Sequence, residues 1–386
     1  MRVTFVLPTV GLSGGNRVIA VYADRLIRRG HEVTLISLPR RKIGILDKLR
    51  TLVRKGKWPK QPPAEPSYFD NIAARHHVLD AARAVLDADV PDGDVVIATY
   101  WRTGPWVAAL SPEKGAKFIL LQGYELTPGQ EEPALDAAWR LPLHKIVISN
   151  WLANLAHQRF GDSYVHLVPN SVDTKQFYAS SRGKAKRPTV GMLYAHGHLK
   201  GTDVSMAALE QVRKKMPHLR VIAFGARQVV AEFPLPEWVE FHYRPPQDQI
   251  RQIYSQCDVW LCGSRCEGFH LPPLEAMACR CPVVSTRVGG PLDTIKDGAN
   301  GFLVDVEDSA GLAEHLMRIL GLGEADWQQM SNAALATATR YAWDDATDLL
   351  ERALFEVINN DPRALDHRNT DSDISTSASI PKSIPG

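Results

Sequence analysis

The sequence has no run of 18 consecutive apolar residues, so we expect no helix that crosses a membrane. The first residues, MRVTFVLPTVGLSGG, also lack the pattern of a signal peptide. Their apolar run is short, breaks into a Gly-rich loop and is not followed by a small-residue cleavage pattern. We expect this segment to be the first strand of a folded domain in a cytoplasmic protein.

A strong net charge is absent as well. The 386 residues carry a net charge of +2, so no global field attracts the chain to nucleic acid. The charge is uneven, because residues 40–60 hold nine Lys or Arg against one Asp, a local charge of +8, and the rest of the chain carries −6. With 45% hydrophobic and 23% charged residues, this length is typical of about two soluble domains.

Cysteine is scarce, and it is confined to one region. The five cysteines lie between residues 257 and 281 and form no C-x-x-C pair. Their spacings do not match the usual zinc pairs, so we expect buried, reduced thiols in preference to a zinc site. The D-x-D patterns at 87–89 and 371–373 fall in an acidic loop and in a polar tail. We therefore expect no metal and no other cofactor.

Short apolar runs alternate with helical patterns in two series. The first series comprises residues 3–7, 32–38, 94–100, 117–123 and 145–150. The second comprises residues 189–194, 220–225, 238–243, 258–264, 281–286 and 301–305. Strands of continuous Val, Ile and Leu between helices are typical of parallel sheets covered on both faces.

This pattern predicts an α/β fold with two doubly wound Rossmann-like domains, at residues 1–170 and 171–340. An amphipathic helix is expected at 341–360, and the Ser/Pro-rich tail 361–386 is expected to be disordered. Ligands of such sheets bind at the carboxyl ends of the strands. The candidate ligand-binding loops are therefore those that follow strands, at 8–16, 122–130, 195–200, 225–228 and 264–272.

The stretch CEGFHLPPLE, which begins at Cys266, has the composition of an anion-binding helix start. Pro272 and Pro273 favour the first helical turn. The backbone amides of Phe269 to Leu271 would then lack partners inside the helix and would meet the positive end of its dipole. Because Gly268 allows a close backbone approach, we expect a phosphate to bind here.

Two carboxylates flank this helix start. Glu267 lies in the loop before it, and Glu275 is expected within the first helical turn. Each could accept hydrogen bonds from sugar hydroxyls. Alternatively, Glu275 could simply stabilise the helix dipole, and Glu267 could be an exposed loop residue.

The string SRCEGFHLPPLEAMACRCPVVST resembles the E-x7-E region of glycosyltransferase family 4, whose members are retaining enzymes of the GT-B fold. The resemblance covers residues 1–360 and implies two domains that face across a cleft, with the C-terminal helix crossing back to the first domain. It also implies a nucleotide-sugar donor, with Glu275 on the ribose diol and Glu267 on hydroxyls of the transferred sugar. The amides of Phe269, His270 and Leu271 would bind the sugar and the diphosphate.

Lys200, in YAHGHLKGTD, lies between a strand and a helix and resembles the family's Lys-Gly pair at the diphosphate. It could instead be a solvated residue. An Arg that the family usually has a few positions earlier is missing. His196 or His198 could replace it, with Arg265 or Arg227 adding charge.

Three further groups are weaker candidates. Gly14 and Gly15 could form a plain turn or a backbone approach to the diphosphate or acceptor, and Asn16 is expected to cap the following helix. Gln122 and Glu125 stand where many relatives have a His, and could contact the sugar or the acceptor.

Arg227 and Tyr243 follow second-domain strands and could flank the base or the phosphates of the donor. Lys200 and Glu267 are the catalytic candidates, and we also keep His198 as a possible sugar or acceptor contact. Neutralisation of the departing diphosphate by Lys200 and the helix dipole would require no metal.

Residues 40–60 form a basic amphipathic pattern, with apolar residues on one helical face at 45, 46, 49, 52 and 53. Such a helix could lie on an anionic membrane, which would suit a lipid-linked acceptor. It could equally dock on its own domain with a solvated basic face.

The expected activity is transfer of a sugar from a nucleotide-sugar donor to a saccharide or lipid-linked saccharide, in bacterial surface polysaccharide or glycolipid synthesis. A nucleotide-sugar epimerase or a phosphorylase of the same fold is an alternative. A non-catalytic nucleotide-sugar-binding partner is another, because the Arg and the His are missing.

Overall fold

The computed structural model describes residues 1–39, 49, 52–53, 66–124 and 132–360. The tail 361–386, which we predicted to be disordered, lies outside the described residues. Most of the basic segment 40–60 and Glu125 also lie outside them. Within the basic segment, Leu49, Leu52 and Val53 are described, and all three side chains are exposed. No helix among the described residues is long and apolar enough to cross a membrane.

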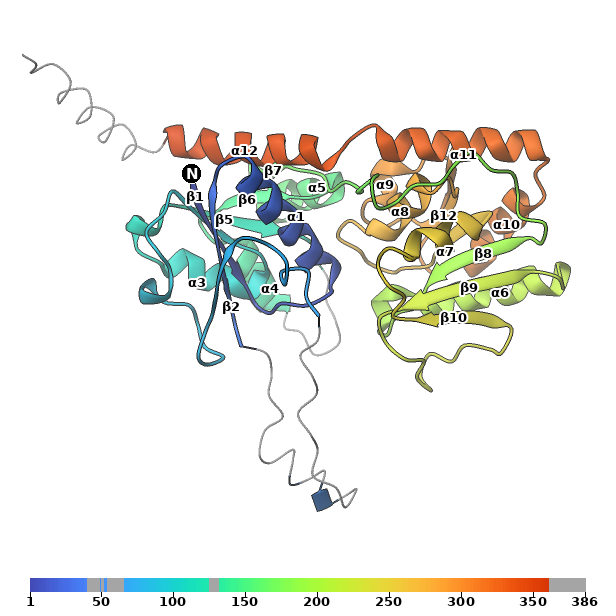
Figure 1. Ribbon diagram of the computed structural model, residues 1–386, viewed down its shortest axis with the longest axis horizontal. Coiled ribbons are helices and arrows are strands. Elements are labelled where there is room, and N and C mark those ends of the chain that lie inside the picture. Colours follow the sequence, from blue (N-terminus) through green and yellow to red (C-terminus); the bar gives the residue numbers. More distant parts are fainter. Residues whose placement is uncertain (40–48, 50–51, 54–65, 125–131, 361–386) are drawn as a thin grey trace, which may run out of the picture.

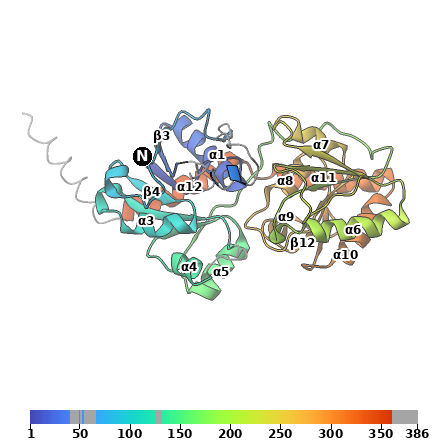
Figure 2. The ribbon, with the colours of Figure 1, turned by 90° about the horizontal axis from the view of Figure 1, so that it is seen from below.

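Two parallel sheets form two lobes that lie side by side (Figures 1 and 2). The first sheet has seven strands in the order β3-β2-β1-β4-β5-β6-β7. Its strands are β1 (Arg2–Leu7), β2 (Glu32–Ser37), β3 (Arg75–Val78), β4 (Val95–Ala98), β5 (Ala116–Leu121), β6 (His144–Val147) and β7 (His166–Leu167).

The second sheet has six strands in the order β10-β9-β8-β11-β12-β13. Its strands are β8 (Thr189–Leu193), β9 (Arg220–Gly225), β10 (Val239–Tyr243), β11 (Val259–Cys262), β12 (Val283–Thr286) and β13 (Gly301–Val304). The prediction of two doubly wound Rossmann-like domains is confirmed. In both sheets the central strands are fully buried, because helices cover both faces.

Helices connect the strands in each domain. The first domain has α1 (Gly14–Arg28), α3 (Gly104–Ala109), α4 (Glu132–Trp139) and α5 (Asn150–Phe160). The second has α6 (Thr202–Lys215), α7 (Ile250–Gln256), α8 (Leu271–Ala278), α9 (Pro291–Thr294), α10 (Ser309–Leu320) and α11 (Glu324–Thr339). The last helix is α12 (Trp343–Asn360).

Helix α12 returns to the first domain, as the resemblance implied. In Figure 1 it runs along that domain, while α11 runs along the second. The rings of Trp343 and Tyr22 meet edge to face with centroids 5.6 Å apart. Arg29 at the end of α1 forms ion pairs with Asp348, at 2.6 Å, and with Glu351. These contacts attach the C-terminal helix α12 to the first domain.

Two helix starts differ from the expectation. Helix α1 is capped by Ser13, whose Oγ accepts from the backbone amide of Asn16 at 3.3 Å, so the assignment of Asn16 as the cap was wrong. Helix α8 begins at Leu271, with His270 as its N-cap residue. The first turn of α8 therefore contains no acidic residue, and Glu275 lies beyond it. Stabilisation of the helix dipole from the first turn is excluded as the role of Glu275.

The cysteines behave as small apolar residues. All five are free thiols; Cys266 is half-buried and the other four are buried. Burial raises the pKa of both Cys257 and Cys279 to about 12, so these thiols stay protonated near neutral pH. No group of three or more His, Cys, Asp or Glu side chains in the described part of the chain is arranged to hold a metal ion.

Candidate functional site

Lys200 and Glu267 meet at the carboxyl edge of the second sheet. Lys200 ends the short η4 helix (His198–Lys200) that follows β8, and Glu267 lies in the loop after the neighbouring strand β11. Lys200 Nζ donates to Glu267 Oε2 at 2.8 Å, and Ser264 Oγ donates to Glu267 Oε1 at 2.9 Å. The structure thus brings both catalytic candidates together, with Glu267 only 5% exposed.

The buried Glu267 carboxyl stays ionised. Burial by itself would raise its pKa, but the positive charge of Lys200 and the hydrogen bonds from Lys200 and Ser264 lower that pKa below its usual range. Burial lowers the pKa of His270, so its imidazole is uncharged near pH 7. Lys200 is therefore the cation that balances Glu267.

Glu275 is held by a first-domain residue that the sequence analysis missed. Arg17 Nη1 donates to Glu275 Oε1 at 2.5 Å, and the hydroxyl of Tyr254 donates to Oε2 at 2.8 Å. Arg17 Nη2 also donates to Gln176 Oε1 at 2.9 Å, and its guanidinium lies 5.0 Å from the ring centroid of Phe177. Burial alone would lower the pKa of Arg17, but the carboxylate of Glu275 reverses this and raises it. The pair links the two domains at the predicted ribose contact.

Gly268 makes another link between the domains. Its carbonyl oxygen accepts from Ser149 Oγ at 3.0 Å and from Trp151 Nε1 at 2.8 Å. A Cβ at Gly268 would lie 1.7 Å from the carbonyl oxygen of Gln122, so only Gly fits. A Cβ at Gly15 would lie 3.3 Å from Gln122 Nε2. Gly14 and Gly15, which were predicted in a loop, are the first residues of α1. The start of α1, Gln122 and the loop before α8 therefore converge at the domain junction.

Arg265 is directed elsewhere. Its guanidinium donates to the carboxylates of Asp203, at 2.7 and 2.8 Å, and Glu307, and to the carbonyl oxygen of His198 at 2.7 Å. Because these acceptors occupy Nε, Nη1 and Nη2, the guanidinium is committed to ion pairs. We therefore do not place Arg265 in the donor site.

The two histidines near Lys200 also differ from each other. His196 Nε2 lies 2.7 Å from the carbonyl oxygen of Gln228, which directs this ring toward the loop after β9. His198 is exposed on η4. Neither position shows a replacement for the missing phosphate Arg.

Arg227 and Tyr243 lie at the carboxyl ends of the neighbouring strands β9 and β10 and are exposed. The guanidinium of Arg244 lies 5.5 Å from the Tyr243 ring centroid. They lie at the edge where a base could stack, and their role stays a prediction.

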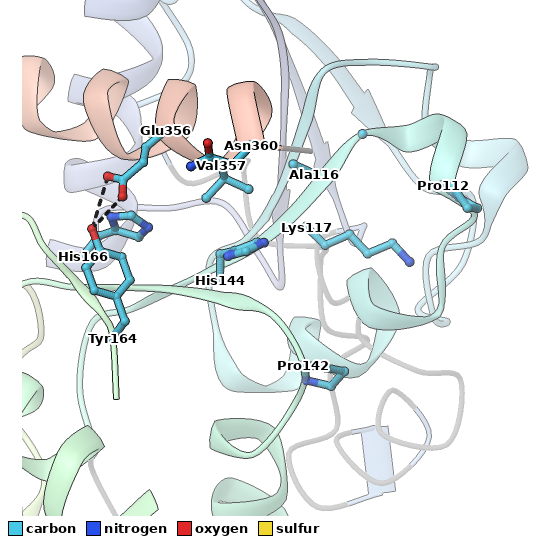
Figure 3. A pocket seen from close by; sticks show the side chains of 11 residues that line it. Pro112, Ala116, Lys117, Pro142, His144, Tyr164, His166, Glu356, Val357 and Asn360 are labelled. Atoms are coloured by element: carbon cyan, nitrogen blue, oxygen red, sulfur yellow. Dashed lines mark hydrogen bonds between the residues drawn. The ribbon is translucent and has the colours of Figure 1, made fainter. Parts of the chain in front are cut away.

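A pocket of about 580 Å³ lies at the amino ends of strands in the first sheet, away from the site at the carboxyl ends (Figure 3). Its lining includes the first residues of β5, β6 and β7, namely Ala116, His144 and His166. Figure 3 shows the hydroxyl of Tyr164 against the carboxylate of Glu356 on α12, with distances of 3.1 and 3.2 Å. Ligands of parallel sheets bind at the carboxyl ends of the strands, so we assign this amino-end pocket to the packing of α12 and not to the chemistry.

Comparison with known proteins identifies the second domain first. The family model described as glycosyl transferases group 1 matches residues 188–321. The D-inositol 3-phosphate glycosyltransferase of Acidothermus cellulolyticus is 26% identical, over 89% of this chain and 85% of that protein. The enzyme of the same name from Mycobacterium marinum is 28% identical, over 89% and 81%.

Solved structures show the same fold over both domains. Sucrose-phosphate synthase from Thermosynechococcus elongatus superposes with a TM-score of 0.70 at 18% identity, over 92% of this chain and 100% of that one. Anabaena Alr3699/HepE in complex with UDP-glucose superposes with a TM-score of 0.66 at 17% identity, over 92% and 99%. The chain therefore has the GT-B fold of these structures, its second domain matches the glycosyl transferases group 1 model, and its sequence is similar to glycosyltransferases over both domains.

Proposed function

We propose that this protein is a glycosyltransferase that moves a sugar from a nucleoside-diphosphate sugar to a saccharide or lipid-linked saccharide, with retention of configuration and without a metal. The observation that carries the proposal is the grouping of Lys200, Glu267 and Glu275 around the start of α8, beside the start of α1 at Gly14 and Gly15. This grouping offers hydrogen-bond acceptors for sugar hydroxyls on either side of a seat for phosphates.

The donor would lie along this row. Glu275 accepts from the ribose diol, because a carboxylate has about four lone-pair sites and Arg17 and Tyr254 use two of them. The amides at the start of α8 and the ammonium of Lys200 bind the diphosphate. Glu267 accepts from a hydroxyl of the transferred sugar.

The reaction breaks the bond between the anomeric carbon and the diphosphate oxygen and forms a bond from that carbon to an acceptor hydroxyl oxygen. Lys200 and the positive end of α8 stabilise the negative charge that develops on the leaving diphosphate. In the retaining reaction the acceptor approaches from the face that the diphosphate leaves. A phosphate oxygen then takes the proton of the acceptor hydroxyl.

The relatives favour a second acceptor class. The two curated relatives reported above are named for an inositol phosphate, which is a phosphorylated cyclic polyol. Among the solved neighbours, TarM has been crystallised with alpha-GlcNAc-glycerol and UDP. A saccharide acceptor in bacterial surface polysaccharide or glycolipid synthesis remains our first proposal, and an inositol phosphate is the competing one.

A thermal-shift screen of nucleotide sugars with different bases, followed by product analysis, tests the function. Ligand binding to the folded protein raises the unfolding temperature by an amount that increases with affinity and with ligand concentration. The proposal expects one nucleotide sugar to stabilise the wild type, and a new glycoside with the donor's anomeric configuration to form when an acceptor is added. Isomerisation of the donor without acceptor would instead favour an epimerase, and dependence on free phosphate a phosphorylase. Binding without turnover would favour a non-catalytic partner.

We further propose a cytoplasmic enzyme that contacts an anionic membrane through residues 40–60. The support is the sequence alone, with its local charge of +8 and its apolar helical face. Neutralising Arg50, Arg54 and Lys55 should weaken sedimentation with vesicles of anionic lipid. As a matched control, three basic residues in the last turn of α6 are neutralised instead: Arg213, Lys214 and Lys215. Equal binding by all three proteins would reject the membrane contact.

A further inference from the structure

His270 adopts a backbone conformation that normally favours glycine. It is the N-cap residue of α8, with φ of 68° and ψ of 80°. Side chains with a Cβ visit this left-handed region at an energetic cost that Gly does not have. Non-Gly residues held there cluster at ligand-binding and catalytic sites, where the surrounding structure imposes the conformation. Because His270 adopts a backbone conformation that favours Gly, we looked for a function of its side chain.

The imidazole is buried but not fully bonded. The His270 side chain is 6% exposed, and its Nδ1 has no hydrogen-bond partner among the residues that the structure describes. Nδ1 faces Glu267 Oε1 at 3.8 Å, which is too long for a direct hydrogen bond. Buried polar atoms are nearly always bonded, so such an atom at a helix start points to a ligand group.

The distance of 3.8 Å suits one bridging oxygen. A hydroxyl oxygen about 2.8 Å from both atoms could accept from Nδ1–H and donate to Oε1. Ser264 Oγ already donates to Oε1, so this carboxylate oxygen acts as an acceptor. With the proton on Nδ1, the arrangement suits a group that donates and accepts at the same atom, as a hydroxyl does.

The local charge favours an uncharged sugar. Lys200 and Glu267 form an ion pair at 2.8 Å and balance each other. If Lys200 turns toward the diphosphate, Glu267 is left as an anion, and it would repel a sugar carboxylate. The uncharged imidazole offers nothing to offset that repulsion.

We propose that His270 and Glu267 together bind one hydroxyl of the transferred sugar, and that His270 thereby selects donors whose sugar is neutral and carries that hydroxyl. The inference rests on the proposed function, because it assigns the transferred sugar to the α8 start. It goes beyond that function by making the side chain of His270, and not only its amide, a determinant of specificity.

The test compares kcat/KM for a series of nucleotide sugars that share one base. To choose the base, the diphosphates of uridine, guanosine, adenosine and thymidine are compared in a thermal-shift assay. The series uses the base of the diphosphate that stabilises the wild type most. The series holds the best donor, its epimers and deoxy analogues at each ring position, and the uronic acid form. His270→Gly removes the imidazole and relieves the left-handed backbone. His270→Asn keeps a hydrogen-bonding group near Nδ1 and tolerates this conformation.

The proposal expects the wild type to disfavour one deoxy analogue by at least about 100-fold, because sites built around a substrate hydroxyl reject analogues that lack it. His270→Gly should reduce kcat/KM for the best donor by about 10- to 100-fold and narrow that discrimination by at least about tenfold. Its affinity for the free nucleoside diphosphate should stay within about twofold, and His270→Asn should recover part of the discrimination.

A matched control exists at the other end of the same helix. Arg280 follows α8 and also has a left-handed backbone, with φ of 62°. Arg280→Gly relieves the same kind of strain without touching the site, and should leave the sugar discrimination as in the wild type. If Arg280→Gly narrowed it equally, the effect of His270→Gly would be one of helix stability.

Two outcomes separate the inference from the function on which it rests. If the wild type discriminates among sugars and His270→Gly does so to the same degree, the role of His270 is overturned and the proposed function stands. If no nucleotide sugar supports turnover by the wild type, the proposed function fails, and the inference fails with it. The inference would also be overturned if His270→Gly lost as much affinity for the free nucleoside diphosphate as it lost in kcat/KM for the best donor. The His270 side chain would then support the phosphate site and not the sugar.

Discussion

Arg17 of α1 in the first domain donates to Glu275 of α8 in the second, with Nη1 and Oε1 2.5 Å apart and side chains that are 13% and 8% exposed. The pair lies next to the proposed seat of the donor ribose. Donor binding and contact between the domains thus depend on the same carboxylate. We regard Arg17 as a positioning residue, because its guanidinium holds the Glu275 carboxylate in place.

Removing Arg17 should be costly for stability. Arg17→Met leaves the Glu275 carboxylate buried with Tyr254 as its only side-chain donor among the described residues, and breaking a buried pair in this way costs about 3–5 kcal/mol. The free energy of unfolding in urea measures this loss. Arg25→Met on the same helix is the control, because its partner Asp344 is exposed, and such pairs contribute at most about 1 kcal/mol. Equal losses in the two variants would contradict a special role for the buried pair.

The domain junction at Gly268 should tolerate no side chain. In Gly268→Ala the new Cβ would lie 1.7 Å from the carbonyl oxygen of Gln122, so a backbone segment has to move. We expect a loss of about 1–3 kcal/mol or more in unfolding free energy. Gly11→Ala is the control, because the nearest atom to its Cβ would be the Asn16 side chain at 3.9 Å. A Gly268→Ala protein as stable as Gly11→Ala would show that the domains do not meet as described.

Much of this architecture could be predicted from sequence, because strands buried on both faces must be continuously apolar. The edge strand β3, RHHV, was missed because all four of its residues are exposed and carry no such pattern. Pro272 and Pro273 were correctly predicted in the first turn of α8, which begins at Leu271. Sequence could not show that Arg17 meets Glu275, since the two are 258 positions apart and meet only when the domains pack. The direction of Arg265 depends on Asp203 and Glu307, which a motif does not reveal.

Acidification should weaken the fold through His166. Burial lowers its pKa; the carboxylate of Glu356 opposes this shift and His144 adds to it. Below about pH 6.5, His166 binds a proton in the unfolded chain, whereas in the folded protein it stays unprotonated until the pH reaches its lower folded pKa. The unfolding free energy should therefore fall as the pH drops from about 6.5 toward the lower folded pKa, by at most about 1.4 kcal/mol per pH unit, and this residue should contribute no change above that range.

Urea unfolding of the wild type and of His166→Phe at pH 7.5, 6.5 and 5.5 measures this contribution. The variant keeps the ring that packs against Tyr164, with centroids 4.9 Å apart in the wild type, but cannot titrate. His270 also has a lowered pKa, but it is present in both proteins and drops out of the difference. The exposed His218 serves as the control site, as His218→Phe. A pH slope in His166→Phe as steep as in the wild type would refute the assignment.

The central claim is that Lys200 and Glu275 bind the diphosphate and the ribose of one donor at the start of α8. Calorimetric titration of a nucleoside diphosphate and of its parent nucleoside into the wild type, Lys200→Met and Glu275→Gln tests it most directly. We predict that Lys200→Met loses about 10-fold or more in affinity for the diphosphate and none for the nucleoside, since only the diphosphate carries charge for the ammonium. Glu275→Gln should weaken both ligands by a similar factor. Unchanged affinity of both variants for the nucleoside diphosphate would contradict the account.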